Sequence, residues 1–219
     1  MRYISIVLLI IGFVASPFFQ VSAASSFTDT VRGQFLLAVE TQGQLWYVNP
    51  LTLKRTYVAT SPHIYDLMRE EGLGISNKDL EKIPVGLAPV LYQDTDGDGL
   101  QNNLEQGMGL LHNDSDTDDD GVSDGVEVQN HTNPKGSGTF PLDEELTKRL
   151  AGRIVLQVES RGEAWFIHPT SLKRYYLGYP SEAMFILAQI GLGITDENLA
   201  RIAIDSSSPK PPTEYSHTD

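Results

Sequence analysis

Two acidic stretches, DTDGDGLQNNLE and DTDDDGVSDGVE, hold most of the groups in this 219-residue chain that could do chemistry. They begin at Asp94 and Asp116, in a region between Lys82 and Lys135 that contains no lysine or arginine. The chain carries 29 acids against 16 lysines and arginines, and 11 of those acids lie in this region. The other 18 acids nearly balance the 16 bases. The acidity is therefore local and needs a local cause.

A hard divalent cation accounts for this pattern. Calcium takes about six to eight oxygen ligands, and its twelve-residue loop uses the first, third, fifth, seventh, ninth and twelfth positions, with glycine at the sixth. Both stretches place glycine at the sixth position and glutamate at the twelfth. The predicted ligands are, in the first loop, Asp94, Asp96, Asp98, the Leu100 carbonyl, Asn102 and Glu105, and, in the second loop, Asp116, Asp118, Asp120, the Val122 carbonyl, Asp124 and Glu127. We therefore expect about two calcium ions per chain.

Cations other than calcium fit the two loops less well. Magnesium prefers a smaller and stricter octahedron and keeps its waters, and oxygen ligands argue against copper and zinc. The alternative without a metal is a solvated acidic linker, since runs of like charge are usually disordered. Such a linker has no need of glycine at the sixth position and glutamate at the twelfth in both loops, so the pattern favours calcium.

The surroundings of the loops indicate a particular kind of calcium repeat. The prolines in IPVGLAPVLYQ oppose a helix before the first loop, so helices are expected only after the loops, in LQNNLEQ and VSDGVEVQ. With these helices, the spacing of the loops and the GVSDGVEV and HTNP phrases, residues 94–134 resemble bacterial thrombospondin type 3-like repeats. The resemblance implies two half-EF-hands packed around calcium as a rigid secreted spacer. The sequence departs from the family at LLHND, residues 110–114, where a Gly-Thr-Asp-Pro phrase is usual.

An internal repeat brackets the acidic segment. Residues 33–83 and 152–202 align without gaps and are identical at about a third of their positions. Each copy has two apolar runs around a permissive turn glycine (Gly43 or Gly162), a third run after a proline turn, and then a helix. A Gly-Leu-Gly-Ile stretch follows as the helix stop, and Ser76 or Thr195 caps a second short helix. We expect an α+β fold in which each copy is a three-stranded sheet with two helices.

The ends of the chain and the two linkers complete the predicted organisation. The first residues combine an arginine, an apolar run and a small-residue cleavage site near Ala23, which is typical of a secretory signal peptide. No second apolar stretch exists, so we expect no membrane span in the mature chain. The predicted segments are a signal peptide at 1–23, a first module at 28–83, linkers at 84–93 and 135–143, a calcium-binding segment at 94–134, a second module at 144–204 and a disordered tail at 205–219.

The flanking copies also carry a resemblance. The phrases GEAWFIHP with KRYYLG, and GQLWYVNP with KRTYVA, are similar to a repeat found in uncharacterised secreted proteins of candidate-phylum bacteria. In those proteins the pattern reads Gly-Glu-Ala-Trp-Tyr-Val-Asn-Pro, followed by Lys-Arg-Tyr-Tyr-Leu-Gly. The resemblance implies that the protein is exported and that such modules occur in the same chain as calcium-binding repeats. It implies no known activity.

Two features of the modules leave a choice between structure and function. The aromatic residues of each copy either fill the core or form a sugar-stacking face, and strand alternation favours the core. Glu40 and Glu159 are expected to form cross-strand ion pairs with Lys54-Arg55 and with the matching basic pair at 173–174, rather than to act in catalysis.

These observations narrow the function classes. The chain has no cysteine and no basic patch, which excludes thiol chemistry and argues against a nucleic-acid partner. It also lacks the HExxH and GxSxG motifs, so we expect no enzyme. The first interpretation is a secreted or cell-envelope calcium-binding protein, in which two ions rigidify a spacer between two interaction modules. The alternative is a surface protein that binds glycan or peptidoglycan, with calcium as scaffold; cell-wall glycan or another envelope protein is the expected partner.

Overall fold

The computed structural model describes residues 26–89 and 92–211. The predicted signal peptide lies outside the described residues. The elements are helices and mainly antiparallel strands, which confirms the predicted α+β class. Among the described residues, no helix combines the length and the apolar character that crossing a membrane requires.

The two copies contain the same elements in the same order, which confirms that they share one fold. The first copy consists of α1 (Phe27–Thr30), β1 (Phe35–Ala38), β2 (Gln44–Val48), β3 (Arg55–Val58), α2 (Ser61–Glu71), β4 (Leu73–Ile75) and α3 (Asn77–Leu80). The second consists of α6 (Glu144–Leu150), β5 (Ile154–Gln157), β6 (Ala164–Ile167), β7 (Arg174–Tyr176), α7 (Pro180–Ile190), β8 (Leu192–Ile194) and α8 (Asp196–Ala200). Between them lie α4 (Asn102–Met108) and α5 (Asp124–Asn130).

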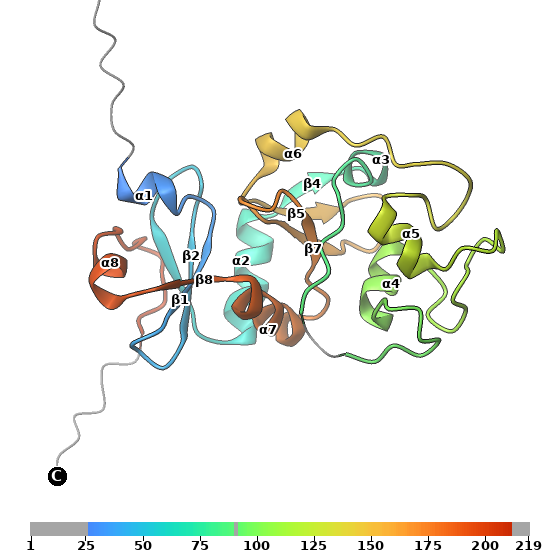
Figure 1. Ribbon diagram of the computed structural model, residues 1–219. Coiled ribbons are helices and arrows are strands. Elements are labelled where there is room, and N and C mark those ends of the chain that lie inside the picture. The colour runs from blue at the N-terminus through green and yellow to red at the C-terminus, as the bar shows by residue number, and fades with distance from the viewer. Residues whose placement is uncertain (1–25, 90–91, 212–219) are drawn as a thin grey trace, which may run out of the picture.

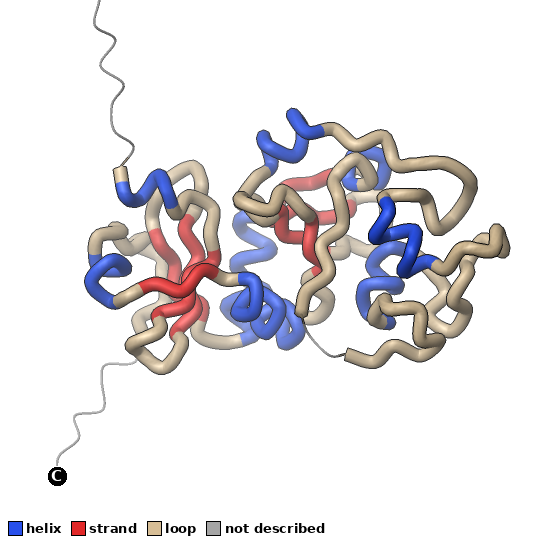
Figure 2. Tube along the Cα trace, viewed as in Figure 1, coloured by secondary structure: helices blue, strands red, loops and turns tan. Residues whose placement is uncertain are grey.

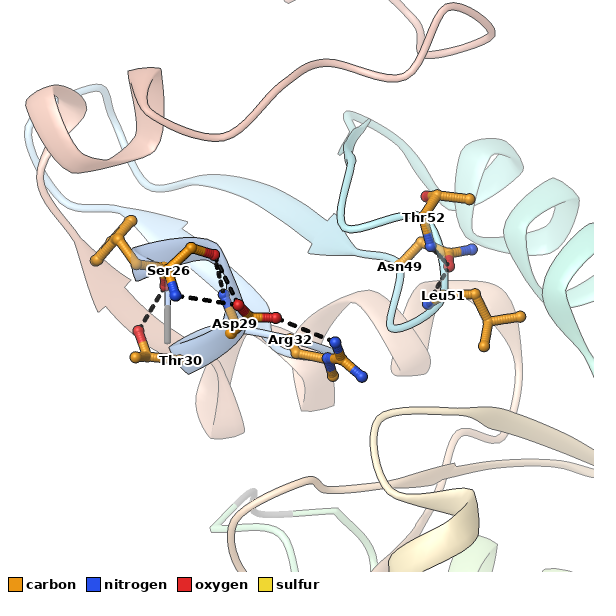
Figure 3. Close-up of polar contacts among 8 residues, drawn as sticks. Ser26, Asp29, Thr30, Arg32, Asn49, Leu51 and Thr52 are labelled. Carbon is orange, nitrogen blue, oxygen red and sulfur yellow. Dashed lines mark hydrogen bonds and ion pairs between the residues drawn. The ribbon is translucent and has the colours of Figure 1, made fainter. Parts of the chain in front are cut away.

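Short side-chain contacts fix where elements of the first copy begin and turn (Figure 3). The Ser26 hydroxyl accepts a hydrogen bond from the Asp29 amide, and the Asp29 carboxylate accepts one from the Ser26 amide in return. Such a capping box satisfies amides that the start of a helix leaves without partners. After β2, the Asn49 side chain accepts hydrogen bonds from the amides of Leu51 and Thr52, at 2.8 and 3.0 Å, and closes the turn before β3.

Each copy sends a fourth strand into the sheet of the other copy. The strand orders are β3-β2-β1-β8 and β4-β5-β6-β7, and the exchanged strands β8 and β4 run parallel to β1 and β5. The register is reciprocal, because Leu36 faces Leu192 in one sheet and Leu73 faces Val155 in the other. The sequence predicts only three strands per copy. A three-residue run that contains glycine is a weak strand signal, and the sequence pattern places it in the helix stop instead.

The exchange builds one central core from both copies. Helices α2 and α7 lie between the two sheets (Figure 1) and contact one another. The rings of Phe35 and Phe166 meet edge to face with centroids 5.0 Å apart. The Tyr47 hydroxyl donates a hydrogen bond of 2.8 Å to the Gly152 carbonyl. Backbones also meet closely here, since a Cβ on Gly33 would lie 2.5 Å from the Gly152 Cα.

The acidic segment packs on the outer face of the second sheet, and we call residues 94–134 the acidic lobe. Apart from α4 and α5 it consists largely of loops (Figure 2). Its buried apolar residues are Leu100, Leu104, Met108, Leu110 and Val128. They form one hydrophobic cluster with residues of the second sheet and of the α3 region, namely Ile75, Leu80, Ile83, Val85, Val155, Trp165 and Ile167. The lobe is therefore joined to a module through a shared core.

This arrangement differs from a spacer that holds two modules apart. The modules contact each other directly through exchanged strands and a shared core, whereas α4 and α5 lie at one end of the molecule (Figure 1). The physical reason is that β4 and β8 each pair outside their own copy, which brings the two copies together whatever the length of chain between them.

The structure also tests the predicted ion pairs of Glu40 and Glu159 and the predicted burial of the module aromatics. Glu40 accepts a hydrogen bond from the Asp196 amide, and Glu159 accepts one from the Asn77 amide, each at 2.8 Å. Both glutamates therefore cap the short helix of the other copy, and the prediction that they form cross-strand ion pairs is wrong. Most of the module aromatics are core, as predicted: Trp46, Tyr47, Tyr57, Trp165 and Phe166 are buried, whereas Tyr65 and Tyr179 are exposed. Alternation is not the reason, because consecutive residues of β2 and of β6 are buried, so both faces of these strands are covered.

The chain after each short helix runs back along the neighbouring sheet. The amide of Arg174 donates to the Pro84 carbonyl, and in the other copy the amide of Arg55 donates to the Ala203 carbonyl. The Ser208 hydroxyl also accepts a hydrogen bond of 2.8 Å from the Tyr57 amide. The first residues of the tail predicted as disordered are therefore ordered against β3, because they repeat a backbone pairing that the other copy makes. Residues 212–219 lie outside the described part.

Candidate metal centre

The two acidic loops each lead directly into a helix. Helices α4 and α5 begin at the ninth loop position, at Asn102 and Asp124. No helix precedes the first loop within the described residues of the 84–93 segment. The prediction of two half-hands with helices only after the loops is therefore confirmed. Each α-helix is seven residues long, so the final glutamate of each loop lies near the middle of its helix.

The aspartates at the first, third and fifth positions come together in both loops. Carboxylate oxygens of Asp94, Asp96 and Asp98 lie within 4.8 Å of one another, and so do those of Asp116, Asp118 and Asp120. The glycine at the sixth position has positive φ in each loop, 96° for Gly99 and 93° for Gly121, where a side chain would be strained. Each triad could hold a metal ion.

The backbone of each loop holds its first aspartate in place. The Asp94 carboxylate accepts hydrogen bonds from the amides of Gly97 and Gly99, at 2.8 and 3.1 Å. In the second loop the Asp116 carboxylate accepts one of 2.8 Å from the Gly121 amide. Each loop therefore wraps around its first carboxylate.

The two final glutamates are buried without hydrogen-bond partners for most of their oxygens. Glu105 is 0 % exposed and Glu127 is 3 % exposed. Within the part of the chain that the structure describes, neither carboxylate oxygen of Glu105, nor Oε2 of Glu127, nor Oδ2 of Asp96 has a hydrogen-bond partner. A buried carboxylate without a partner costs free energy unless a cation compensates it. These orphaned oxygens therefore fit a bound cation.

The pKa values of the two final glutamates reflect the same lack of compensation for their charge. Burial, followed by repulsion from Asp96, Asp98 and other loop carboxylates, raises the pKa of Glu105 to about 7. Burial, followed by repulsion that includes Asp120, also raises the pKa of Glu127. Like charges crowded in a desolvated site disfavour the ionised form. A divalent cation would reverse that preference by neutralising the carboxylates.

The side chains at the ninth position close the loops. Asn102 exchanges two hydrogen bonds with Thr95, accepting from its amide at 2.9 Å and donating to its hydroxyl at 2.7 Å. Asp124 accepts two from Thr117, from its amide at 2.9 Å and from its hydroxyl at 2.6 Å. The structure thus adds the two threonines to the predicted site. A threonine at the second position of both loops was the sequence signal that could have revealed them.

The structure brings the carboxylates of each triad together, but it does not test whether the seventh and ninth positions bind an ion. The backbones of Leu100 and Val122 are fixed by their amides, which donate to Asp98 and Asp120 at 2.8 and 2.9 Å. Their carbonyls stay predicted ligands, as do the side chains at the ninth position.

The two loops contact each other directly. The Gly125 amide donates a hydrogen bond of 2.6 Å to the Asp98 carboxylate. A Cβ on Gly125 would lie 2.1 Å from the Asp98 carbonyl oxygen, so only glycine allows this approach. A carboxylate of the first triad is thereby tied to the start of the helix of the second loop.

Replacing Gly125 by alanine should weaken metal binding at both loops, by about tenfold or more, because the clash separates them. Calcium titration calorimetry would measure the change. Val126→Ala is the matched control, since Val126 is the next residue on α5 and is 45 % exposed. Equal effects of the two substitutions would show that the contact between the loops does not matter.

Comparison with known families agrees with this geometry. Comparison with curated proteins and with solved structures gave no match. A family model described as the bacterial TSP3 repeat matches residues 94–106 and 116–135. The resemblance predicted from the loops is therefore confirmed over both of them. Repeats of this family typically bind calcium. The acidic lobe thus contains two stretches similar to bacterial TSP3 repeats, each with an aspartate triad that could hold a metal ion.

Proposed function

We propose that this chain is a non-enzymatic calcium-binding protein whose acidic lobe takes two calcium ions, one per loop. The observation that carries the proposal is the pair of buried glutamates, Glu105 and Glu127, whose oxygens lack hydrogen-bond partners next to the aspartate triads. Hydrogen bonds within the lobe leave these charges uncompensated. Calcium, a hard cation that prefers carboxylate oxygens, supplies the missing charge.

In the first loop the triad Asp94, Asp96 and Asp98 would hold the ion together with Glu105 and the Leu100 carbonyl. In the second loop the corresponding ligands would be Asp116, Asp118, Asp120, Glu127 and the Val122 carbonyl. Asn102 and Asp124 add a ligand only if they also reach the ion while bonded to their threonines. Calcium supplies charge neutralisation and a tie between loop and helix, and no reaction chemistry.

The proposed role of the ions is structural. Each final glutamate stands within the helix that follows its loop, so an ion bound by triad and glutamate joins that helix to its loop. The helices carry Leu104, Met108 and Val128 into the cluster that covers Trp165. Calcium would therefore complete the core on the outer face of the second sheet, instead of stiffening a free strut.

Export to the cell surface or the medium also belongs to this proposal. Its support is the signal-peptide pattern at the N-terminus and the similarity of the loops to bacterial TSP3 repeats. Outside cells calcium is abundant, so weak sites suffice, and affinities of about 10⁻⁴ to 10⁻³ M are usual for extracellular modules. A fluorescent fusion of the first 23 residues to a reporter, followed by fractionation, would test the export.

Isothermal titration of the purified protein with calcium should give two sites. Asp118→Asn, which removes one triad carboxylate, should weaken the second site by about tenfold or more. Asp119→Asn is the matched control, because it makes the same charge change at the next residue, outside the triad. Asparagine also tolerates the φ of 59° that Asp119 adopts.

The comparison separates a coordinated ion from a diffuse counterion atmosphere. If general negative charge attracted the ions, both substitutions would reduce affinity alike. A titration with less than one site per chain, or with equal effects of the two substitutions, contradicts the proposed function.

A further inference from the structure

A cavity of about 500 Å³ lies where the two copies and the acidic lobe meet. Its walls come from α2, from α4, from the turn between β5 and β6, and from the start of α7. Figure 1 labels the three helices. Small-molecule sites commonly have volumes of about 300 to 1,000 Å³ and favour such junctions. A second cavity, of about 210 Å³, shares Gln106, Arg161 and Glu163 with the first and extends it along α4.

Two tyrosines offer exposed rings at the cavity. Tyr65 on α2 is 55 % exposed and Tyr179 before α7 is 67 % exposed, unlike the buried aromatics of the cores. An exposed tyrosine combines an apolar ring face with a polar hydroxyl, which suits a ligand that has an apolar face and polar edges. The amides of Asn103 and Gln106 on α4 add hydrogen-bonding groups to the same walls.

Two arginines at the cavity have guanidinium groups without a bonding partner among the described residues. Arg69 on α2 and Arg161 in the β5–β6 turn line the cavity. Within the described residues, no hydrogen bond or ion pair is made by either guanidinium group. The two carboxylates at the cavity already accept hydrogen bonds within the protein. Glu163 accepts hydrogen bonds from the Ser160 hydroxyl and the Arg161 backbone amide, and Glu182 accepts one from the Tyr179 backbone amide. A free guanidinium pairs well with a carboxylate of a ligand.

The two copies differ at the residues that give the cavity its chemistry. The scaffold is shared, because Trp165 corresponds to Trp46 and Tyr176 to Tyr57. The cavity residues Tyr65, Arg69, Arg161, Glu163 and Tyr179 correspond instead to Met184, Ala188, Gln42, Gln44 and Thr60. A purely structural role would not require this change on one side only. The stacking and charged groups belong to the face that the acidic lobe covers.

We propose that this cavity binds a saccharide that carries a carboxylate, and that calcium controls the binding through α4. The sugar ring would stack on the tyrosines, its hydroxyls would bond to the amides, and its carboxylate would pair with the arginines. This inference rests on the proposed function, because Asn103 and Gln106 lie on α4 within two residues of the proposed calcium ligand Glu105.

The link between α4 and the cavity is direct. A Cβ on Gly107 would lie 2.6 Å from the ring of Tyr176, so α4 packs against a cavity residue at van der Waals distance. Loss of calcium loosens α4 and removes one wall of the cavity. Saccharide affinity is therefore expected to fall in chelator.

The test is a titration of the calcium-loaded protein with glucuronate, galacturonate and N-acetylmuramate, and with glucose, galactose and N-acetylglucosamine as neutral counterparts. At least one acidic sugar should bind about tenfold more tightly than its counterpart, because a paired carboxylate adds charge-assisted hydrogen bonds. The same titration in chelator should show little binding.

Variants in which a cavity arginine is replaced by the residue at the matching position of the other copy make the test more specific. Arg161→Gln and Arg69→Ala should each reduce affinity for the acidic sugar by about tenfold and leave calcium binding unchanged. Alanine suits a helix, so Arg69→Ala keeps α2 intact. Arg149→Gln, at an exposed arginine away from this cavity, is the control and should change nothing.

The outcomes separate this inference from the proposed function. Calcium binding with no acidic sugar bound, or equal binding of acidic and neutral sugars, overturns the inference and leaves the calcium site standing. Equal sugar binding with calcium and with chelator overturns the control by calcium. Failure to bind calcium at all overturns the proposed function.

Discussion

Gly33→Ala should destabilise the whole fold by about 2 to 6 kcal/mol, a large part of the stability of a typical domain. Two causes add. Gly33 has a φ of 69°, which strains an alanine, and the added Cβ would lie 2.5 Å from the Gly152 Cα. The neighbouring atoms are backbone, so they cannot rotate away. The two copies would have to separate at the point where their backbones meet.

Gly43→Ala is the control that isolates the second cause. Gly43 has nearly the same φ, 70°, but the atom nearest to its added Cβ is a Leu37 methyl group 3.8 Å away. Strain alone should cost about 1 to 2 kcal/mol. Urea unfolding of the two variants measures the difference. Equal losses would show that the close contact with Gly152 does not hold the copies together.

Calcium should stabilise the acidic lobe and the second sheet more than the first sheet. At about 100 times its dissociation constant, each ion contributes about 2.7 kcal/mol, so two ions contribute about 5 kcal/mol. The effect reaches the second sheet because the lobe shares its hydrophobic cluster with Trp165, whereas Trp46 lies in a different cluster over the first sheet.

The two tryptophans of the chain report on these two places separately. Trp46→Phe leaves Trp165 as the reporter, and Trp165→Phe leaves Trp46. Urea unfolding followed by fluorescence should show a large shift between calcium and chelator for Trp165 and a smaller one for Trp46. The same shift for both would mean that calcium stabilises the molecule as one unit.

The sequence predicts the local features of the candidate metal centre well. Local sequence identifies the triad of each loop, the glycine with positive φ at the sixth position and a helix after each loop, because all of these depend on neighbouring residues. The observed helices begin at Asn102 and Asp124, two residues after the starts of the predicted stretches. The same holds for the α+β class, the hairpins and the caps at Ser76 and Thr195.

What the sequence does not predict depends on contacts between distant residues. A Leu-Gly-Ile strand has the same sequence whether it pairs within its copy or in the other one, so the exchange of β4 and β8 is decided by tertiary packing. The capping role of Glu40 follows from that exchange, since its partner amide belongs to Asp196 of the other copy. The packing of the lobe on Trp165 is also long-range.

Hydrogen–deuterium exchange with and without calcium tests most directly the claim that calcium orders the acidic lobe. With calcium, amides of residues 94–134 should become protected, together with the part of β6 around Trp165. The core between α2 and α7 should stay protected in chelator as well, because it contains no lobe residues. Proteolysis in chelator should accordingly begin between Asp94 and Asn133. Protection of residues 94–134 that is the same with calcium and with chelator would contradict the account.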